Sequence, residues 1–62
     1  MKTQILEIIN NVIKNNPNIS SYHLGLETWK TMCIECNWDF YNLDTDDAKK
    51  FDEIFSNYLD KK

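Results

Sequence analysis

The chain has 62 residues, of which 42% are hydrophobic, 13% aromatic and 27% charged, and its formal net charge at pH 7 is −3. This length supports one domain, near the lower limit for folding without a disulfide, a metal ion or a second subunit. The hydrophobic content argues against intrinsic disorder, and no run approaches the ~20 apolar residues of a membrane span. All basic residues are Lys, and since Arg is the side chain best suited to contact phosphate and guanine, we expect no direct binding of nucleic acid.

The N-terminal segment does not resemble a targeting signal. The apolar run after Lys2 is interrupted by Glu7 and Asn10, and no small-residue cleavage site follows it. We therefore expect a cytoplasmic protein in which Cys33 and Cys36 are reduced thiols. The abundance of Asn, Ile and Lys is typical of an AT-rich bacterial or viral genome.

Residues 3–15 predict the first helix. Six apolar side chains share one arc of about 160° on a helical wheel, and these are Ile5, Leu6, Ile8, Ile9, Val12 and Ile13. The helix should end near Asn15 and Asn16, because Pro17 disfavours helical geometry in the residue before it.

A second helix is predicted from residue 21 onward, with Ser20 or Ser21 as its N-cap. Its main apolar stripe covers about 120° of the helical wheel and comprises Tyr22, Leu26, Trp29, Met32, Cys33, Cys36 and Phe40. We expect this stripe to face the core. If Ser20 is the cap, Ile19 and Leu24 occupy the two positions of a hydrophobic staple.

Gly25 lies within this predicted helix and weakens it by about 1 kcal/mol relative to Ala, which indicates a close contact with another helix at that point. A strand over residues 22–34 is the alternative, because Tyr22, Leu24 and Leu26 alternate with polar or small residues. The alternation fails after Leu26, so the helix is favoured.

The same region carries a second apolar stripe, in which Ile34, Trp38 and Tyr41 are spaced i, i+4, i+7 on roughly the opposite side of the helix. This stripe forms only if the helix continues to Tyr41. If the helix ends at Asn37, Trp38 can fold back onto the first helix and complete the core instead. Helices of 21–37 and 21–41 are both compatible with the sequence.

Residues 45–60 predict the third helix. Asp44 is a suitable N-cap with Asp47 at the third position, and Lys61 and Lys62 lie at the negative end of the helix dipole. The core stripe of this helix consists of Ala48, Phe51, Ile54, Phe55, Tyr58 and Leu59. Three helices with short links predict an all-α fold, a single small three-helix domain that is either monomeric or part of a helical homodimer.

Cys33 and Cys36 form a C-x-x-C pattern. A zinc site would need two further ligands, and a thioredoxin-like redox role would need a βαβ context, so we expect both side chains to pack in the core. His23, a cysteine and Asp39 would supply the residue types of a nucleophilic triad, but no local signature supports one. We predict no catalytic residue and no cofactor.

Asn42, Asp44, Asp46 and Glu53 match positions 1, 3, 5 and 12 of a calcium-binding loop. The match is incomplete, because Asp47 stands where the sharp turn requires Gly. Helix capping accounts for the same acids, so no metal site is predicted.

Acidic residues without an intervening Lys occupy the middle of the chain, and these are Glu35, Asp39, Asp44, Asp46 and Asp47. They could imitate the charge of a nucleic acid and occupy a basic groove, although phosphate mimicry needs more acids in a row. A solvated acidic rim is the simpler interpretation.

We expect a non-enzymatic protein that binds and inhibits or modulates another protein, of the general type that phages and mobile elements carry. The predicted contact residues are Ile34, Trp38 and Tyr41, with Glu35 and Asp39 steering the approach of a basic protein surface. A self-associating helical module, in which both stripes are covered within an oligomer, is the main alternative. A metal-binding or redox C-x-x-C protein is a remote one.

Overall fold

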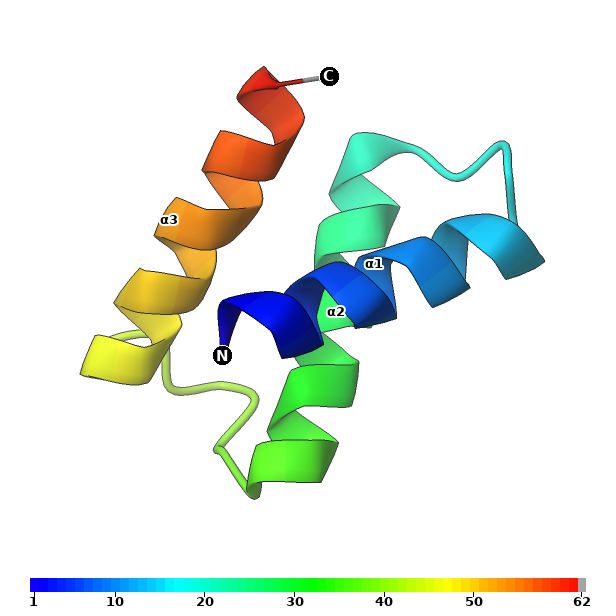
Figure 1. The fold of residues 1–62 in the computed structure, drawn as a ribbon. Helices are drawn as coiled ribbons and strands as arrows, with labels where there is room; N and C mark the ends of the chain where they lie inside the picture. Colours follow the sequence, from blue (N-terminus) through cyan, green and yellow to red (C-terminus); the bar gives the residue numbers. More distant parts are fainter. Residues whose placement is uncertain (62) are drawn as a thin grey trace.

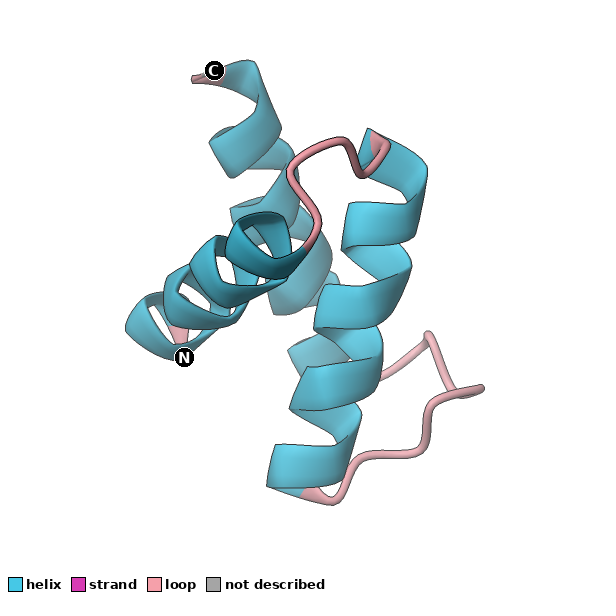
Figure 2. Cartoon of the chain, turned by 90° about the vertical axis from the view of Figure 1, so that its right-hand side faces the viewer, coloured by secondary structure: helices cyan, strands magenta, loops and turns pink. Residues whose placement is uncertain are grey.

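The computed structural model describes residues 1–61 and contains three helices, α1 (Lys2–Asn15), α2 (Ser21–Cys36) and α3 (Asp46–Asp60). Figure 1 shows α1 lying across α2, while α3 follows a longer connection and closes the third side of the domain. Figure 2, viewed from the side, shows helices joined only by loops. The predicted all-α class is confirmed, and the strand over 22–34 is wrong because that segment is helical.

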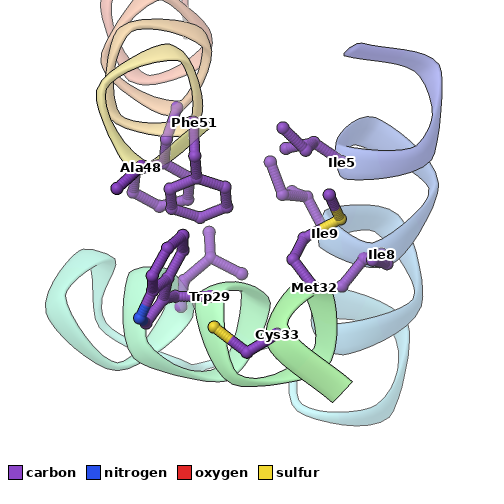
Figure 3. Packing of buried hydrophobic residues seen from close by; sticks show 10 residues of the cluster. Ile5, Ile8, Ile9, Trp29, Met32, Cys33, Ala48 and Phe51 are labelled. Atoms are coloured by element: carbon purple, nitrogen blue, oxygen red, sulfur yellow. The ribbon is translucent and has the colours of Figure 1, made fainter. Parts of the chain in front are cut away.

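The core lies where the three helices face one another, and each helix contributes to it. Its buried hydrophobic residues are Ile5, Ile8, Ile9, Leu24, Trp29, Met32, Cys33, Ala48, Phe51 and Phe55. Figure 3 shows the side chains of α1, α2 and α3 pointing into this shared space. No helix within residues 1–61 combines the length and the apolar character needed to cross a bilayer.

The apolar arc predicted for α1 faces the core. Ile5, Ile8 and Ile9 are buried, and the other three members of the arc pack partly against them. The helix ends at Asn15, and the backbone N–H of Asn16 donates to the carbonyl oxygens two and three residues inside the helix end, on Ile13 and Val12.

The buried face of α2 is rotated relative to the prediction, and this part of the prediction is wrong. Tyr22 and Leu26 were placed in the core stripe, but Tyr22 is 72% exposed and Leu26 is 40% exposed. Leu24 and Thr28 are buried instead. The Thr28 hydroxyl donates to the carbonyl of Leu24 at 2.7 Å, which satisfies its polar group inside the core.

The rotation follows from the two helices that pack on α2. The Gln4 side chain of α1 donates to the Glu35 carboxylate at 2.8 Å, and Leu24 and Thr28 lie on the same side of α2 as Glu35. Near the N-terminal end of α2, a Cβ atom at Gly25 would lie 3.3 Å from the Phe55 ring of α3. The predicted close contact at Gly25 is therefore confirmed.

Both ends of α2 depend on short polar residues. Ser20 is the N-cap, and its hydroxyl accepts a hydrogen bond from the backbone N–H of His23 at 3.2 Å. At the other end α2 stops at Cys36, and Asn37 adopts the left-handed conformation with φ 57° and ψ 42°. Asn tolerates that conformation better than most residues. A helix that continues to Tyr41 is therefore wrong, and the shorter alternative describes α2 to within one residue.

The N-cap of α3 is Thr45 rather than the predicted Asp44. The Thr45 hydroxyl accepts from the backbone N–H of Ala48 at 3.1 Å. Asp44 belongs to the preceding turn, where its backbone N–H donates to the Asn42 side chain at 3.2 Å. The core stripe of α3 is confirmed, and α3 ends with Lys61 as its C-cap. Lys62, predicted at the same end, lies outside the described residues.

Candidate protein-binding surface

Ile34, Trp38 and Tyr41 line one shallow cavity of about 500 Å³, together with Lys30, Cys33 and Phe40. The three residues do not form a helical stripe, because Ile34 belongs to α2 while Trp38 and Tyr41 belong to the segment after it. Ile34 is 72% exposed and Tyr41 is 88% exposed. We call the surface formed by Ile34, Trp38 and Tyr41 the aromatic face.

Trp38 is half-buried, and its indole packs against the edge of the core. Its ring centroid lies 5.7 Å from that of Trp29 with an interplanar angle of 34°. Trp38 is thus neither fully exposed nor sealed inside the protomer. It forms the floor of the aromatic face, while Ile34 and Tyr41 project from it.

The segment that carries Trp38 and Tyr41 is held by specific hydrogen bonds. The backbone N–H of Trp38 donates to the carbonyl of Cys33 at 2.9 Å, and the indole N–H of Trp29 donates to the carbonyl of Phe40 at 2.9 Å. The Asp39 carboxylate accepts from the backbone N–H of Tyr41 at 3.0 Å. These bonds order the segment before any partner binds.

The two acidic residues predicted beside the aromatic face take different positions. Asp39 stands in the same segment, between Trp38 and Phe40, and its carboxylate shapes the turn that presents Tyr41. Glu35 is exposed but is hydrogen-bonded to Gln4 of α1, away from the cavity. Neither acid lines the cavity: Asp39 supports the turn that carries Tyr41, and Glu35 is directed toward α1.

A second apolar hollow was missed in the sequence. A groove of about 510 Å³ between α2 and α3 is walled by Tyr22, Leu26 and Leu43. Sequence periodicity placed Tyr22 and Leu26 in the core and assigned no role to Leu43, which is 65% exposed. The available signal was the wide spread of apolar residues around α2, more than two packed neighbours can cover. We call this hollow the α2–α3 groove.

Cys33 and Cys36 are free thiols that pack into or against the core, as predicted. Burial raises the pKa of the Cys33 thiol, and the negative charges of Asp39 and Cys36 raise that pKa further. A thiol with a raised pKa is a poor nucleophile and a poor metal ligand at neutral pH. Across residues 1–61, no group of three or more His, Cys, Asp or Glu side chains is placed to hold a metal ion.

The triad considered from residue types is not assembled. His23 lies in the first turn of α2, where its Nδ1 is 2.9 Å from the Ser20 hydroxyl, and Cys33 follows ten residues later on the same helix. Ten residues of helix place their Cα atoms roughly 15 Å apart. His23 therefore cannot activate that thiol in this arrangement.

The residues of the incomplete calcium loop serve the entry into α3. Asn42 accepts a backbone hydrogen bond from Asp44, and Asp46 begins the helix that also carries Glu53. A helix over these positions prevents the loop geometry in which a calcium ion is surrounded.

Comparison of the chain with models of protein families, with characterised proteins and with solved structures finds no match.

Proposed function

We propose that this chain is a small non-enzymatic protein that binds another protein through the aromatic face and thereby inhibits or modulates it. The observation that carries the proposal is the exposure of Ile34 and Tyr41, at 72% and 88%, beside the half-buried Trp38. A large aromatic ring and a β-branched side chain that leave apolar area in solvent gain free energy when a partner covers them.

The aromatic face has the composition and the rigidity of a binding site. Trp and Tyr are enriched among the residues that dominate binding energy at protein interfaces. The segment carrying Trp38 and Tyr41 is already ordered by hydrogen bonds from Trp29 and to Asp39. Binding would therefore lose little additional backbone entropy, which favours affinity.

Lys30 is the charged residue that lines the cavity of the aromatic face, but the chain segment around this face is acidic and favours a basic partner. Between residues 35 and 47 the chain has five acidic residues and no Lys. Carboxylates at the edge of an interface accelerate the approach of an oppositely charged surface and suppress binding of acidic proteins. The size and the acidic charge of the chain are also typical of accessory proteins carried by phages and mobile elements.

The test compares the wild type with an Ile34→Ala/Tyr41→Ala variant as bait in an extract of the native host. Both side chains are mainly exposed, so the variant should keep the helical circular-dichroism spectrum of the wild type. We expect one protein to be retained by the wild type and to bind the variant at least tenfold more weakly after purification, since two such contacts typically contribute about 2 kcal/mol or more.

Tyr22→Ala is the matched control, because Tyr22 is also 72% exposed on α2 but lies outside the aromatic face. It should retain the partner. Equal retention by the wild type and by the Ile34→Ala/Tyr41→Ala variant would contradict the proposal. Trp38→Ala is less informative, because loss of its contact with Trp29 would also destabilise the fold.

A further inference from the structure

The α2–α3 groove has an apolar floor and apolar walls that remain open to solvent. Trp29, Phe51 and Phe55 form the floor, and each is a buried core residue whose outer edge lines the groove. The walls are formed by Tyr22, Leu26 and Leu43, which are 72%, 40% and 65% exposed. The groove is therefore a place where the core itself is incompletely covered.

The charge of the groove differs from that of the rest of the molecule. Lys49 and Asp52 are the charged residues that line it, one of each sign, whereas the whole chain carries a formal net charge of −3. Because the charges of Lys49 and Asp52 cancel, the groove does not select a basic partner. It also does not repel a second copy of this acidic chain. Across a two-fold axis, the lysine of one copy can approach the aspartate of the other.

The groove combines a projecting side chain with a hollow, as a self-complementary patch requires. Tyr22 projects from α2 directly beside a hollow of about 510 Å³, which has room for large side chains of a neighbouring molecule. In a two-fold arrangement each copy places its projecting side chain into the hollow of the other, because the same patch then serves both partners.

The available area fits a weak dimer. The apolar area that a second copy could cover comes mainly from Tyr22, Leu26 and Leu43, and an aromatic side chain buries roughly 150–250 Å² when fully covered. Even with the polar rim, the interface would be smaller than the roughly 1,200–2,000 Å² that stable, specific interfaces bury in total, and would belong with the weak, transient ones. A domain of 62 residues has a small core and gains stability from such an association.

From these observations we propose that the α2–α3 groove is the interface of a two-fold homodimer. The proposal is independent of the partner-binding role of the aromatic face, since Ile34 and Tyr41 do not line the groove. Each copy would carry its own aromatic face, and the dimer would present two of them.

The experiment is sedimentation equilibrium of the purified chain at protein concentrations from about 1 µM to 300 µM, a range that brackets a Kd on the order of 10 µM. The mean mass should rise with concentration from the 7.4 kDa of a single chain to twice that value. Tyr22→Glu and Leu43→Glu each place a charge in the groove. Both should remain at the monomer mass while keeping the far-ultraviolet circular dichroism of the wild type.

Ile34→Glu is the matched control, because Ile34 has the same 72% exposure as Tyr22 and lies on the same helix. It should dimerise as the wild type does. A wild type that stays monomeric over the whole range, or a mass that rises beyond the dimer, overturns the proposal. Loss of dimerisation in Ile34→Glu with no loss in Tyr22→Glu overturns it as well.

The two proposals fail separately. If the groove is not an interface, the wild type is monomeric but the Ile34→Ala/Tyr41→Ala variant still loses the partner. If the aromatic face does not bind a partner, no protein is lost from that variant, while the mass of the wild type still doubles.

Discussion

Cys33 and Cys36 show how two identical residues, one helical turn apart, acquire different environments. Cys33 is 5% exposed, whereas Cys36 is half-buried near the end of α2. Burial and the nearby charge of Asp39 raise the pKa of the Cys33 thiol. The C-x-x-C pattern alone predicted core packing for both residues, but the difference between them depends on which side of α2 is covered.

The raised pKa of Cys33 predicts slow chemistry at this thiol. Because the thiolate is the reactive species, we expect Cys33 in a Cys36→Ser variant to react with iodoacetamide at pH 8 about tenfold more slowly than Cys36 in a Cys33→Ser variant. Mass spectrometry of samples quenched over time measures both rates. Equal rates in the folded proteins would show that Cys33 is not protected.

The same shift predicts how stability depends on pH. The Cys33 pKa is higher in the folded chain than its ordinary value of 9.0, so the unfolded chain loses this proton first as the pH rises. The contribution of Cys33 is complete below about pH 9 and declines above it. Urea unfolding from pH 7 to pH 10 should show a decline for the wild type that is shallower in Cys33→Ala. If the free energy of unfolding fell equally steeply with pH in the wild type and in Cys33→Ala, the raised pKa of Cys33 would be contradicted.

At the scale of single elements, the ends of the helices are decided by short polar residues acting in combination. Asp44 and Thr45 are both good N-caps in isolation. The turn in which Asn42 accepts from the backbone of Asp44 places Asp44 one residue too early, so Thr45 caps α3. The capping preferences of the residues therefore predicted the start of α3 to within one residue. The preceding turn decided that Thr45, and not Asp44, is the N-cap.

Because Thr45 is the N-cap, alanine substitutions at Thr45 and Asp44 should change the free energy of unfolding by different amounts. Thr45→Ala removes the side-chain acceptor of the Ala48 N–H and should lower the free energy of unfolding by about 0.5–2 kcal/mol. Asp44→Ala serves as the control and should change it by less than about 0.5 kcal/mol, as for an ordinary surface site. Thermal or urea unfolding followed by circular dichroism measures both. A larger loss in Asp44→Ala would restore Asp44 as the cap.

At the scale of the whole molecule, one core is shared by the three helices, each of which contributes buried side chains. Phe51 of α3 illustrates this, because its ring centroid lies 5.1 Å from that of Trp29 in α2 and 5.9 Å from that of Phe55. Removing the Phe51 side chain weakens the contact between α2 and α3 and leaves a cavity in the shared core. A domain of this length is typically stable by only about 3–9 kcal/mol.

Phe51→Ala should therefore unfold most of the chain. Loss of a buried phenylalanine costs about 3–5 kcal/mol, which is comparable to the whole stability. We expect the circular-dichroism signal of all three helices to fall together at 25 °C. Asp52→Ala, at the exposed neighbouring position, should leave it unchanged. If about two thirds of the helical signal remained in Phe51→Ala, α1 and α2 would form an independent unit.

Sequence reasoning determined what depends on neighbours along the chain. The apolar periodicity of α1 and α3, a serine cap at residue 20 or 21 and the stop before Pro17 are local features, and each appears in the structure, with Ser20 as the cap. The close approach of another helix at Gly25 was also predicted from the sequence. A glycine inside a helix lowers its stability, and a tight helix contact explains why one is present. These features together imply three helices and a common core.

Only the tertiary structure decided which face of α2 is buried. α2 packs against α1 near Glu35 and against α3 at Gly25, so the covered arc depends on the directions of both neighbours and not on the hydrophobicity of α2 alone. That choice buried Thr28 and left Tyr22 and Leu26 in solvent. The left-handed turn at Asn37 likewise set Trp38 on Trp29 rather than on a helical stripe. The α2–α3 groove arises from contacts between helices, which periodicity along one helix cannot reveal. The aromatic face arises from the turn after α2, where the structure decided between the two helix ends that the sequence allowed.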